Sequence, residues 1–360
     1  MSDVLVLGCG LLGTSLALAL RESDFSDVTL VDADEQHVQA AVALGAGRRW
    51  DGVERAGVVV AAVPPAVTAS ALIGLQRRDV GRTYTHLCSV QSHVQAEIEA
   101  SSPDPSRVAG GHPLAGREVT GPEGAVADLF VGRPWALCPG PSTAPDALAT
   151  VRALAEAAAA VPVEVAPDAH DRAVALLSHL PQVASSALAA QLVASSSGLE
   201  LPVALAGPGL VDTTRLAAGD ADLWTDILSA NATHVAPLVA GLAESLTDLG
   251  SALQRIASGD TTAAAEVRGL LVLGNAGRAT VPVKRGELAG AFGRVRVVLP
   301  DRPGELGRLL RSAGDAGVNV EDVHVEHVPG RPTGLVDLLV DTGEQRRLAA
   351  VLREAEWQLI

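Results

Sequence analysis

Short apolar runs alternate with stretches of helical periodicity over the first part of the chain. Residues 3–8 form an apolar run that ends in glycine, 11–21 have helical spacing, and 28–32 and 57–63 are two further buried runs. Strand, helix and strand at this spacing are typical of βαβ units and a parallel sheet. The same reasoning predicts a helix over 34–44 and strands over 84–90, 107–111 and 134–138.

The pattern changes beyond residue 167. Residues 168–196 and 222–258 predict long helices, because polar positions recur every three or four residues among Ala and Leu. These helices are too apolar to be covered by one face of the first domain, so we expect their surplus to be buried in a two-fold homodimer. The glycine-rich segment 275–293 predicts a linker.

A third pattern follows the linker. It predicts six elements in the order strand, helix, strand, strand, helix, strand, and the first of the two adjacent strands has a period of two. Their ranges are 294–299, 304–316, 318–328, 335–341, 344–355 and 357–360. The βαββαβ order is that of a ferredoxin-like domain.

Together these patterns predict an α/β fold class in three domains. A Rossmann-type parallel sheet domain covers 1–165, and an all-helical dimerisation and substrate domain covers 166–275. A linker over 276–293 leads to the ferredoxin-like domain over 294–360. Hydrophobic residues make up 48% of the chain and aromatic residues only 2%, so Ala, Val and Leu build the core of a globular protein.

Charge and cysteine content narrow the functional classes. Acidic residues number 42 and basic residues 27, so the formal net charge is −15, and we expect no binding of nucleic acids or anionic membranes. The cysteines Cys9, Cys88 and Cys138 lack CxxC spacing, which argues against a disulfide framework and a zinc site, and we expect no metal. Apolar runs fall short of the ~20 residues that span a bilayer. We expect no signal peptide and a cytoplasmic location.

The first glycine-rich turn has the features of a dinucleotide site. The run Gly8-Cys9-Gly10-Leu11-Leu12-Gly13 fits GxGxxG between a predicted strand and a predicted helix, and Asp32 ends the next strand. Gly8 permits the tight turn, Gly10 lets a pyrophosphate approach the backbone, and Gly13 allows close helix–strand packing. Asp32 can accept hydrogen bonds from a ribose hydroxyl and would repel a 2′-phosphate, which favours NAD over NADP. The alternative is a tight turn that binds nothing.

A second glycine-rich segment is the candidate catalytic segment. Residues 110–118, GGHPLAGRE, predict an irregular loop after a strand and contain His112 and Glu118. Parallel sheets bind ligands at such loops, and an imidazole can take a proton from a hydroxyl as hydride leaves the same carbon. His112 is therefore either a base or a structural loop residue. Ser89, at the end of a predicted strand, could contact substrate or cap the next helix.

Two segments of the helical region add further candidates. Arg215 lies in an otherwise apolar region and could bind a substrate carboxylate in a bidentate manner, or form an ion pair with Asp212 or Asp220. His170 and His179 follow in DAHD and SHLPQ, and each could equally be a core or capping histidine.

These segments together resemble the prephenate dehydrogenase family. The residues that carry the resemblance are GCGLLG with Asp32, GHPLAGRE with Thr120-Gly121, DAHDRAVALLSHLP, and DTTRLAAGDADLWTDILSAN. The last two motifs are far more specific than GxGxxG, and the resemblance covers about residues 3–258. The tail, with DRPGEL and GVNV, resembles an ACT domain, a type that commonly binds amino acids.

The resemblance implies NAD-dependent oxidation and decarboxylation of prephenate to 4-hydroxyphenylpyruvate, in tyrosine biosynthesis. His112 would bond and deprotonate the 4-hydroxyl, and Ser89 would contact that hydroxyl or orient His112. Arg215 would bind a substrate carboxylate, and Glu118 would shape the entrance. His179 and Gln182 would also lie in the substrate site.

The chain departs from the family pattern at three positions. The family usually has Asp-x-x-Ser-Val-Lys where this chain has His86 and Gln91 at the two ends, and Leu-Pro-His where it has Gln182. These departures bear on the identity of the substrate. Two alternatives to prephenate oxidation follow: a relative acting on arogenate or 4-amino-4-deoxyprephenate, and a sensor that binds nucleotide and amino acid without turnover.

The ACT resemblance suggests an effector site. The first helix of the small domain could hold the carboxylate of an amino acid at its N-terminus, near Asp301, Gly304 and Glu305, with Asn319 binding the amino group. Tyrosine is the expected effector. The alternatives are a domain that serves only dimerisation, and tyrosine inhibition at the active site.

Overall fold

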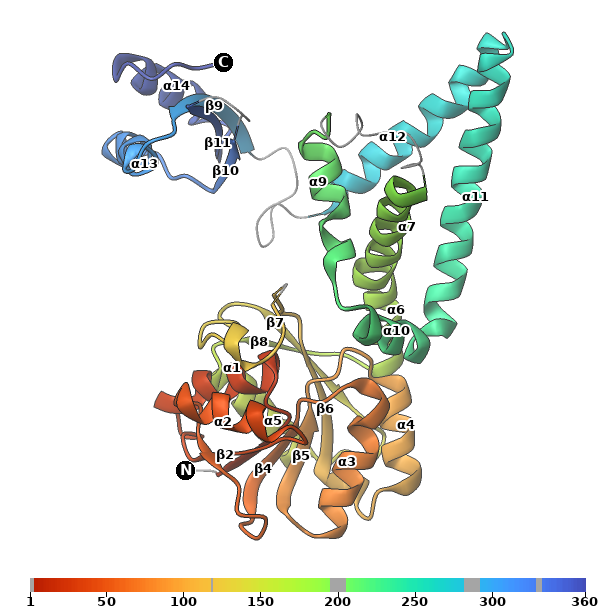
Figure 1. Cartoon of the computed structure of the whole chain (residues 1–360), viewed down its shortest axis with the longest axis vertical. Helices are drawn as coiled ribbons and strands as arrows, with labels where there is room; N and C mark the ends of the chain where they lie inside the picture. Colours follow the sequence, from red (N-terminus) through yellow and green to blue (C-terminus); the bar gives the residue numbers. More distant parts are fainter. Residues whose placement is uncertain (1–2, 118, 195–204, 282–291, 328–331) are drawn as a thin grey trace. The chain divides into compact units, whose positions relative to one another are not determined.

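The computed structural model describes residues 3–117, 119–194, 205–281, 292–327 and 332–360. The chain divides into two compact units, residues 1–242 and 243–360, and each is described by itself. The first unit contains a large sheet and the helices that follow it. The second contains the end of a long helix, the helix that follows it, and a small antiparallel sheet with two helices of its own (Figure 1).

An eight-stranded sheet forms the centre of the first unit (Figure 1). Its order is β3-β2-β1-β4-β5-β6-β7-β8, and neighbouring strands are parallel except for β6 and β7. The strands are β1 (Val4–Leu7), β2 (Val28–Val31), β3 (Arg48–Arg49), β4 (Ala56–Ala61), β5 (Gly81–His86), β6 (Val108–Pro113), β7 (Pro134–Pro139) and β8 (Val161–Glu164). The predicted Rossmann-type sheet is confirmed. The C-terminal ends of β1, β2, β4, β5 and β6 meet at one edge, where such sheets bind ligands.

The predicted strand over 84–90 is wrong at both ends. β5 begins at Gly81 and ends at His86, and residues 87–90 form a loop. Leu87, Cys88 and Val90 are buried in that loop, so their hydrophobicity reflects burial outside a strand. Thr83 and Thr85 are polar but buried within β5, which hid its first half from the apolar pattern.

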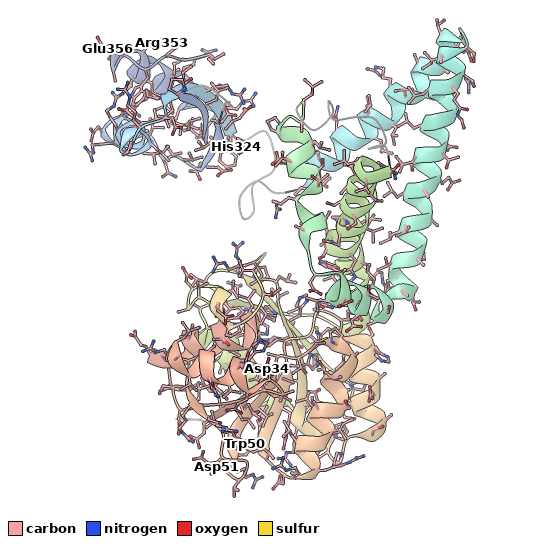
Figure 2. All side chains as sticks on the ribbon, viewed as in Figure 1. Asp34, Trp50, Asp51, His324, Arg353 and Glu356 are labelled. Atoms are coloured by element: carbon pink, nitrogen blue, oxygen red, sulfur yellow. The ribbon has the colours of Figure 1, made fainter. Side chains whose placement is uncertain are left out.

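Five helices accompany the strands: α1 (Leu11–Ala19), α2 (Glu35–Ala43), α3 (Pro65–Arg77), α4 (Ser92–Ser101) and α5 (Pro145–Ala157). The predicted helices at 11–21 and 34–44 correspond to α1 and α2, whereas α3 and α4 had not been predicted. The edge strand β3 was also absent from the prediction. It is followed by a polar turn in which Asp51 accepts hydrogen bonds from the amides of Val53 and Glu54, and Trp50 donates to the Glu54 carbonyl (Figure 2).

The predicted helix over 168–196 is present with a wider turn in its middle. α6 (Pro167–Val174) continues through a π-helical turn, Ala175–His179, into α7 (Leu180–Ala194). Of the described residues, only Pro167–Ala194 makes a helix long and apolar enough to cross a membrane, with mean hydropathy 1.3. Asp171 and His179 are nevertheless buried in it against groups of the first unit, which is typical of a core helix.

The remaining helices correct two predicted boundaries. The predicted helix over 222–258 is two helices, α10 (Ala221–Ala230) and α11 (Ala232–Ala257), which are separated at Asn231. α9 (Pro208–Thr214) and the 3₁₀ turn Arg215–Ala218 precede them. α12 (Ala264–Thr280) extends into the predicted linker, so residues 275–280 are helical. A Cβ added at Gly277 would meet no atom within 4 Å, so this exposed glycine costs the helix only about 1 kcal/mol. Residues 282–291 lie outside the described part.

The C-terminal residues have the predicted order of elements. They are β9 (Phe292–Pro300), α13 (Glu305–Asp315), β10 (Asp322–His327), β11 (Thr333–Asp341) and α14 (Gln345–Glu354), with an antiparallel sheet in the order β10-β11-β9. The predicted last strand is reduced to a single bridge between Leu359 and Val297 on β9. Val297, Leu309, Val336 and Leu348 are fully buried between sheet and helices.

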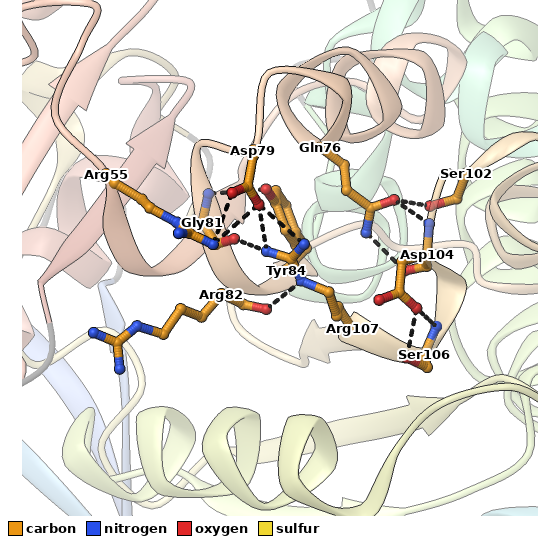
Figure 3. Close-up of polar contacts among 10 residues, drawn as sticks. All are labelled: Arg55, Gln76, Asp79, Gly81, Arg82, Tyr84, Ser102, Asp104, Ser106 and Arg107. Carbon is orange, nitrogen blue, oxygen red and sulfur yellow. Dashed lines mark hydrogen bonds and ion pairs between the residues drawn. The ribbon is translucent and has the colours of Figure 1, made fainter.

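A network of polar side chains lies at the N-terminal ends of the parallel strands, opposite the ligand-binding edge (Figure 3). Asp79 accepts hydrogen bonds from Arg55 and Arg107. The buried Gln76 of α3 donates to the Asp104 carbonyl over 2.7 Å and accepts from the Asp104 amide over 2.9 Å. One side chain thus joins α3 to the segment that enters β6.

Replacing Gln76 tests whether this join contributes to stability. Gln76→Ala leaves both backbone groups of Asp104 without their partner, and we expect it to lower the free energy of unfolding by about 1–3 kcal/mol. Arg82→Ala is the matched control, because Arg82 is exposed and contributes only its carbonyl to the network. Thermal melts followed by circular dichroism provide the measurement. Equal melting temperatures for the two variants would contradict the expectation.

Candidate active site

The glycine-rich turn between β1 and α1 is shaped by close packing. Gly8 has φ +100°, and a Cβ there would lie 2.3 Å from the Ala62 carbonyl oxygen. A Cβ at Gly13 would lie 1.9 Å from the Gly8 oxygen, whereas one at Gly10 would meet no atom within 4 Å. The turn is therefore closed against β4 and open at Gly10, where a pyrophosphate can approach the backbone. Leu11 and Leu12 pack against the core and hold the first turn of α1 in place.

Asp32 lies directly after β2 and reaches back to this turn. Its Oδ2 accepts a hydrogen bond from the Cys9 amide over 2.6 Å, and its Oδ1 accepts from the Asp34 amide over 2.8 Å. Asp34 in turn caps α2 by accepting from the Gln36 amide (Figure 2). Since a carboxylate has about four acceptor positions, two remain for ribose hydroxyls. The residues present therefore fit an NAD adenosine.

Cys9 is a packed residue of the turn. Its side chain is fully buried, and burial, followed by the charge of Asp32, raises the pKa of its thiol to about 12. It remains a thiol at neutral pH and has no nucleophilic role.

His112 lies in a strand, which corrects the predicted loop. It is the fifth residue of β6 and pairs with Ala136 of β7. β6 was predicted to end at residue 111, because the two glycines and Pro113 resemble a loop sequence. A Cβ at Gly110 would lie 2.5 Å from Gln91 Oε1, and one at Gly111 would lie 2.8 Å from Trp135 Nε1, so the glycines are needed for packing. The half-buried His112 is thereby held at the ligand-binding edge of the sheet.

A chain of hydrogen bonds leads from His112 into the core. His112 Nδ1 lies 2.8 Å from His170 Nε2, and His170 Nδ1 lies 2.8 Å from Asp171 Oδ1. The two imidazole rings meet edge to face, with centroids 5.0 Å apart. His170 and Asp171 are both buried.

Asp171 also caps α4 from a distant part of the sequence. Its Oδ1 accepts from the Gln91 amide over 2.8 Å, and its Oδ2 accepts from the Ser92 amide over 2.7 Å. Burial alone would raise the pKa of Asp171, but hydrogen bonds from His170, Ser92 and Gln91 together hold it below its usual value. The carboxylate is therefore ionised, and the N-terminus of α4 favours its charge.

Three histidines of the site are neutral at neutral pH. Burial, aided by the neighbouring His170, lowers the pKa of His112 to about 3 and that of His86 to about 4. Burial likewise lowers the pKa of His179 to about 4. His112 is thus available as a proton acceptor.

His179 ends the π-helical turn and faces the helical region. Its Nδ1 lies 3.1 Å from Asn231 Nδ2, and its ring contacts that of Trp224 edge to face. Asn231 also donates to the Asp171 carbonyl over 2.8 Å. Single wide turns of this kind are frequent at functional sites, because they change which face of the helix the following residues occupy.

The other predicted site residues have different surroundings. Gln182 is buried on α7, and Arg215 is exposed at the start of the 3₁₀ turn. Ser185 accepts a hydrogen bond from the Ala217 amide, which ties this turn to α7. Ser89 is half-buried in the loop after β5. Glu118 lies outside the described residues.

The two departures at His86 and Gln91 lie behind the site. Gln91 is 1% exposed, and its Nε2 donates to the carbonyls of Cys88 and Gly111. His86 is fully buried and accepts from the Cys88 amide. The side-chain amide of Gln91 thus donates to backbone carbonyls, and its bond to Cys88 holds the loop that carries Ser89.

The residues proposed to bind an effector form mainly local contacts within the small domain. Gly304 has φ +88° and is the N-cap of α13, and Glu305 forms an ion pair with Arg308. Asn319 donates to Glu321, and the Asp301 amide donates to the Pro332 carbonyl.

Sequence reasoning missed the roles of Asp171 and Asn231. It left His170 open as a core or capping residue. The motif DAHD was the available signal for this pair: its adjacent residues His170 and Asp171 bind different partners, His112 and the start of α4. The contact of Asp171 with Gln91 spans 80 residues and has no local signature.

Comparison with known proteins identifies both domains of the first part of the chain. Residues 16–164 match the family described as prephenate dehydrogenase, nucleotide-binding domain, and residues 166–265 match prephenate dehydrogenase, dimerization domain. The chain is 34% identical to the probable prephenate dehydrogenase NovF of Streptomyces niveus, over 99% of both chains.

Two solved structures share the fold of this region. Prephenate dehydrogenase of Aquifex aeolicus, in complex with hydroxyphenyl propionate and NAD⁺, is 26% identical with a TM-score of 0.64, and the match covers 76% of this chain and 98% of that one. Arogenate dehydrogenase of Synechocystis is 26% identical with a TM-score of 0.62, and the match covers 77% of this chain and 98% of that one. The glycine turn with Asp32, the position of His112 and these matches agree: the chain is an NAD-dependent oxidoreductase of the prephenate dehydrogenase family.

Proposed function

We propose that the chain catalyses oxidative decarboxylation of prephenate to 4-hydroxyphenylpyruvate, with NAD as hydride acceptor. The observation that carries the proposal is the neutral His112 at the C-terminal end of β6, on the same sheet edge as the glycine turn. Gly10 and Asp32 would hold NAD, whose nicotinamide would supply the acceptor for the hydride of the ring carbon that bears the 4-hydroxyl. The ring carboxylate leaves as CO₂, and the ring becomes aromatic.

The protein groups supply proton acceptance and orientation. His112 accepts the proton of the 4-hydroxyl while hydride leaves, and returns it to the phenolic oxygen when the electrons of the carboxylate bond enter the ring. Ser89 contacts the same hydroxyl, and Arg215 binds a substrate carboxylate. Since aromatisation and CO₂ loss drive the reaction, alignment of the hydride and binding of the carboxylates are the main requirements.

A substrate with an amino group is the second candidate. The similarity to prephenate dehydrogenase and arogenate dehydrogenase structures is equal at 26% identity. His179 and Gln182 are three residues apart on the helix surface, so they share a face, and a neutral amide can accept a hydrogen bond from an ammonium group. The retained His112 and Arg215 favour turnover over a sensor role.

Measuring NADH formation with prephenate, arogenate and 4-amino-4-deoxyprephenate side by side tests the function. We expect the highest kcat/KM with prephenate. A higher value with either amino compound would transfer the assignment to that substrate, and no NADH with any of the three would contradict the enzymatic function.

Replacing His112 tests its role as proton acceptor. His112→Asn removes the acceptor, so we expect kcat to fall by about 10²–10⁴-fold while NAD binding, measured by calorimetry, stays normal. Because the pKa of His112 is about 3, the wild type has neutral His112 throughout the range from pH 5 to 8. Its kcat/KM should then show no acid limb near the ordinary imidazole pKa of 6.5. Unchanged kcat in the variant would remove His112 from the mechanism.

We further propose that the chain is a cytoplasmic homodimer. Apolar side chains remain exposed on α7 and α11, among them Leu192, Leu246 and Leu253, and a second copy would cover them. A stable monomer at micromolar concentration in light scattering would contradict the dimer.

The small C-terminal domain is the proposed regulatory part. Its βαββα order and antiparallel sheet support the proposal of an ACT domain, and tyrosine is the proposed effector. An effector shifts activity only if it binds the active and inhibited states with different affinity. Tyrosine inhibition that is strictly competitive with prephenate, and unaltered when Asn319 and Glu305 are replaced by Ala, would place tyrosine in the catalytic site.

A further inference from the structure

The hydrogen bonds behind His112 form one continuous chain that ends on a single carboxylate. His112 Nδ1 and His170 Nε2 are 2.8 Å apart, as are His170 Nδ1 and Asp171 Oδ1. The outer end of the chain is half-buried and the inner end is 1% exposed. The chain therefore connects the substrate edge of the sheet to a buried negative charge.

The ionised carboxylate fixes the proton positions on both rings. A carboxylate only accepts hydrogen bonds, so His170 must carry its proton on Nδ1. When His170 carries one ring proton, its lone pair lies on Nε2, and His112 donates to it from Nδ1. His112 Nε2 is left with the lone pair, which is the arrangement a proton acceptor needs at the substrate.

We propose that His170 and Asp171 are positioning residues that form a proton relay behind His112. This inference rests on the proposed oxidation of a ring hydroxyl. His112 Nε2 receives the hydroxyl proton, and His112 Nδ1–H passes its own proton to His170 Nε2. His170 then carries a proton on each nitrogen, and its positive charge lies beside the Asp171 carboxylate.

The relay conserves protons and electrons. The bond from the substrate oxygen to hydrogen breaks, one N–H bond forms on His112 Nε2, and one N–H bond is exchanged between His112 Nδ1 and His170 Nε2. The proton returns by the reverse path when the phenolic oxygen forms. The hydride leaves with NAD and the carboxylate as CO₂, as in the proposed reaction, and no further oxidant is needed.

The surroundings of His112 explain why the charge has to move inward. Burial is the main cause that disfavours a charged His112, and the charge of Asp171 acts in the opposite sense. The nearby thiols of Cys88 and Cys138 have pKa values raised by burial, so both remain neutral. A positive charge on His170 would lie 2.8 Å from the Asp171 carboxylate, whereas a charge on His112 would be separated from that carboxylate by the His170 ring.

The key variant keeps the hydrogen bonds and removes the relay. In His170→Gln the amide oxygen can accept from His112 and the amide hydrogens can donate to Asp171, but the amide cannot exchange a proton. We expect kcat to fall by about 10²-fold, within the range of lost acid–base catalysis, with the KM for prephenate and the melting temperature near those of the wild type. His170→Asn serves as a second variant if His170→Gln folds poorly.

A matched control is a second histidine–carboxylate pair. His234 of α11 pairs with Asp168 of α6 over 3.0 Å, and this pair lies outside the hydrogen-bond chain of His112. His234→Gln should leave kcat, KM and the solvent isotope effect unchanged. A relay of two protons predicts a curved dependence of kcat on the deuterium fraction of the solvent in the wild type and in His234→Gln, and a linear dependence in His170→Gln.

A readout without turnover separates this inference from the proposed function. Nitrogen chemical shifts of isotope-labelled imidazoles report the tautomers directly, and we expect His112 and His170 of the full-length wild type to carry their protons on Nδ1. His112 protonated on Nε2, or kcat in His170→Gln within about threefold of the wild type, would overturn the relay. Loss of activity of the wild type on all ring substrates would overturn the proposed function and leave the tautomer result to decide the proton positions.

Discussion

The candidate active site depends on the hydrogen bonds of one buried carboxylate, that of Asp171. It accepts hydrogen bonds from the amides of Gln91 and Ser92 and from His170. A buried carboxylate is costly unless its acceptor positions are filled, so these hydrogen bonds favour the arrangement in which α6 meets the start of α4. That arrangement places the loop that carries Ser89, and it orients His170 toward His112. The helical domain thereby completes a site that the sheet begins.

The sheet supplies the other half of the geometry by packing. Gly8 and Gly13 allow the turn to close against β4, and Asp32 holds the Cys9 amide of the same turn. Gly110 and Gly111 let β6 lie against Gln91 and Trp135, which brings His112 to the same edge. Binding of NAD and acceptance of a proton are thus both consequences of where parallel strands end.

The parts of this account that could be predicted from sequence are local ones. Apolar runs separated by helical spacing predict the parallel sheet, and the spacing of Gly8, Gly10, Gly13 and Asp32 predicts the nucleotide turn. His112 was singled out, although its strand was mistaken for a loop because glycine and proline are rare in strands. The strands, the helices and the glycine turn are each determined mainly by neighbouring residues, so a local sequence pattern is enough to predict them.

The parts that could not be predicted depend on contacts distant in sequence. Asp171 meets Gln91 across 80 residues, and Asn231 meets the Asp171 carbonyl across 60. β5 was misplaced because Thr83 and Thr85 are buried polar residues, while the apolar loop after it is buried without being a strand. The helix over residues 275–280 was taken for a linker because its glycines outweighed the periodicity that continues from α12.

Amide hydrogen exchange at Gln91 and Ser92 tests the central role of Asp171 most directly. Both amides donate to its carboxylate, so they should exchange slowly in the wild type. In Asp171→Ala they should lose this protection, while amides within β1 and β4 keep theirs. Equal protection of Gln91 and Ser92 in the two proteins would contradict the claim that this carboxylate joins the helical domain to the nucleotide-binding domain.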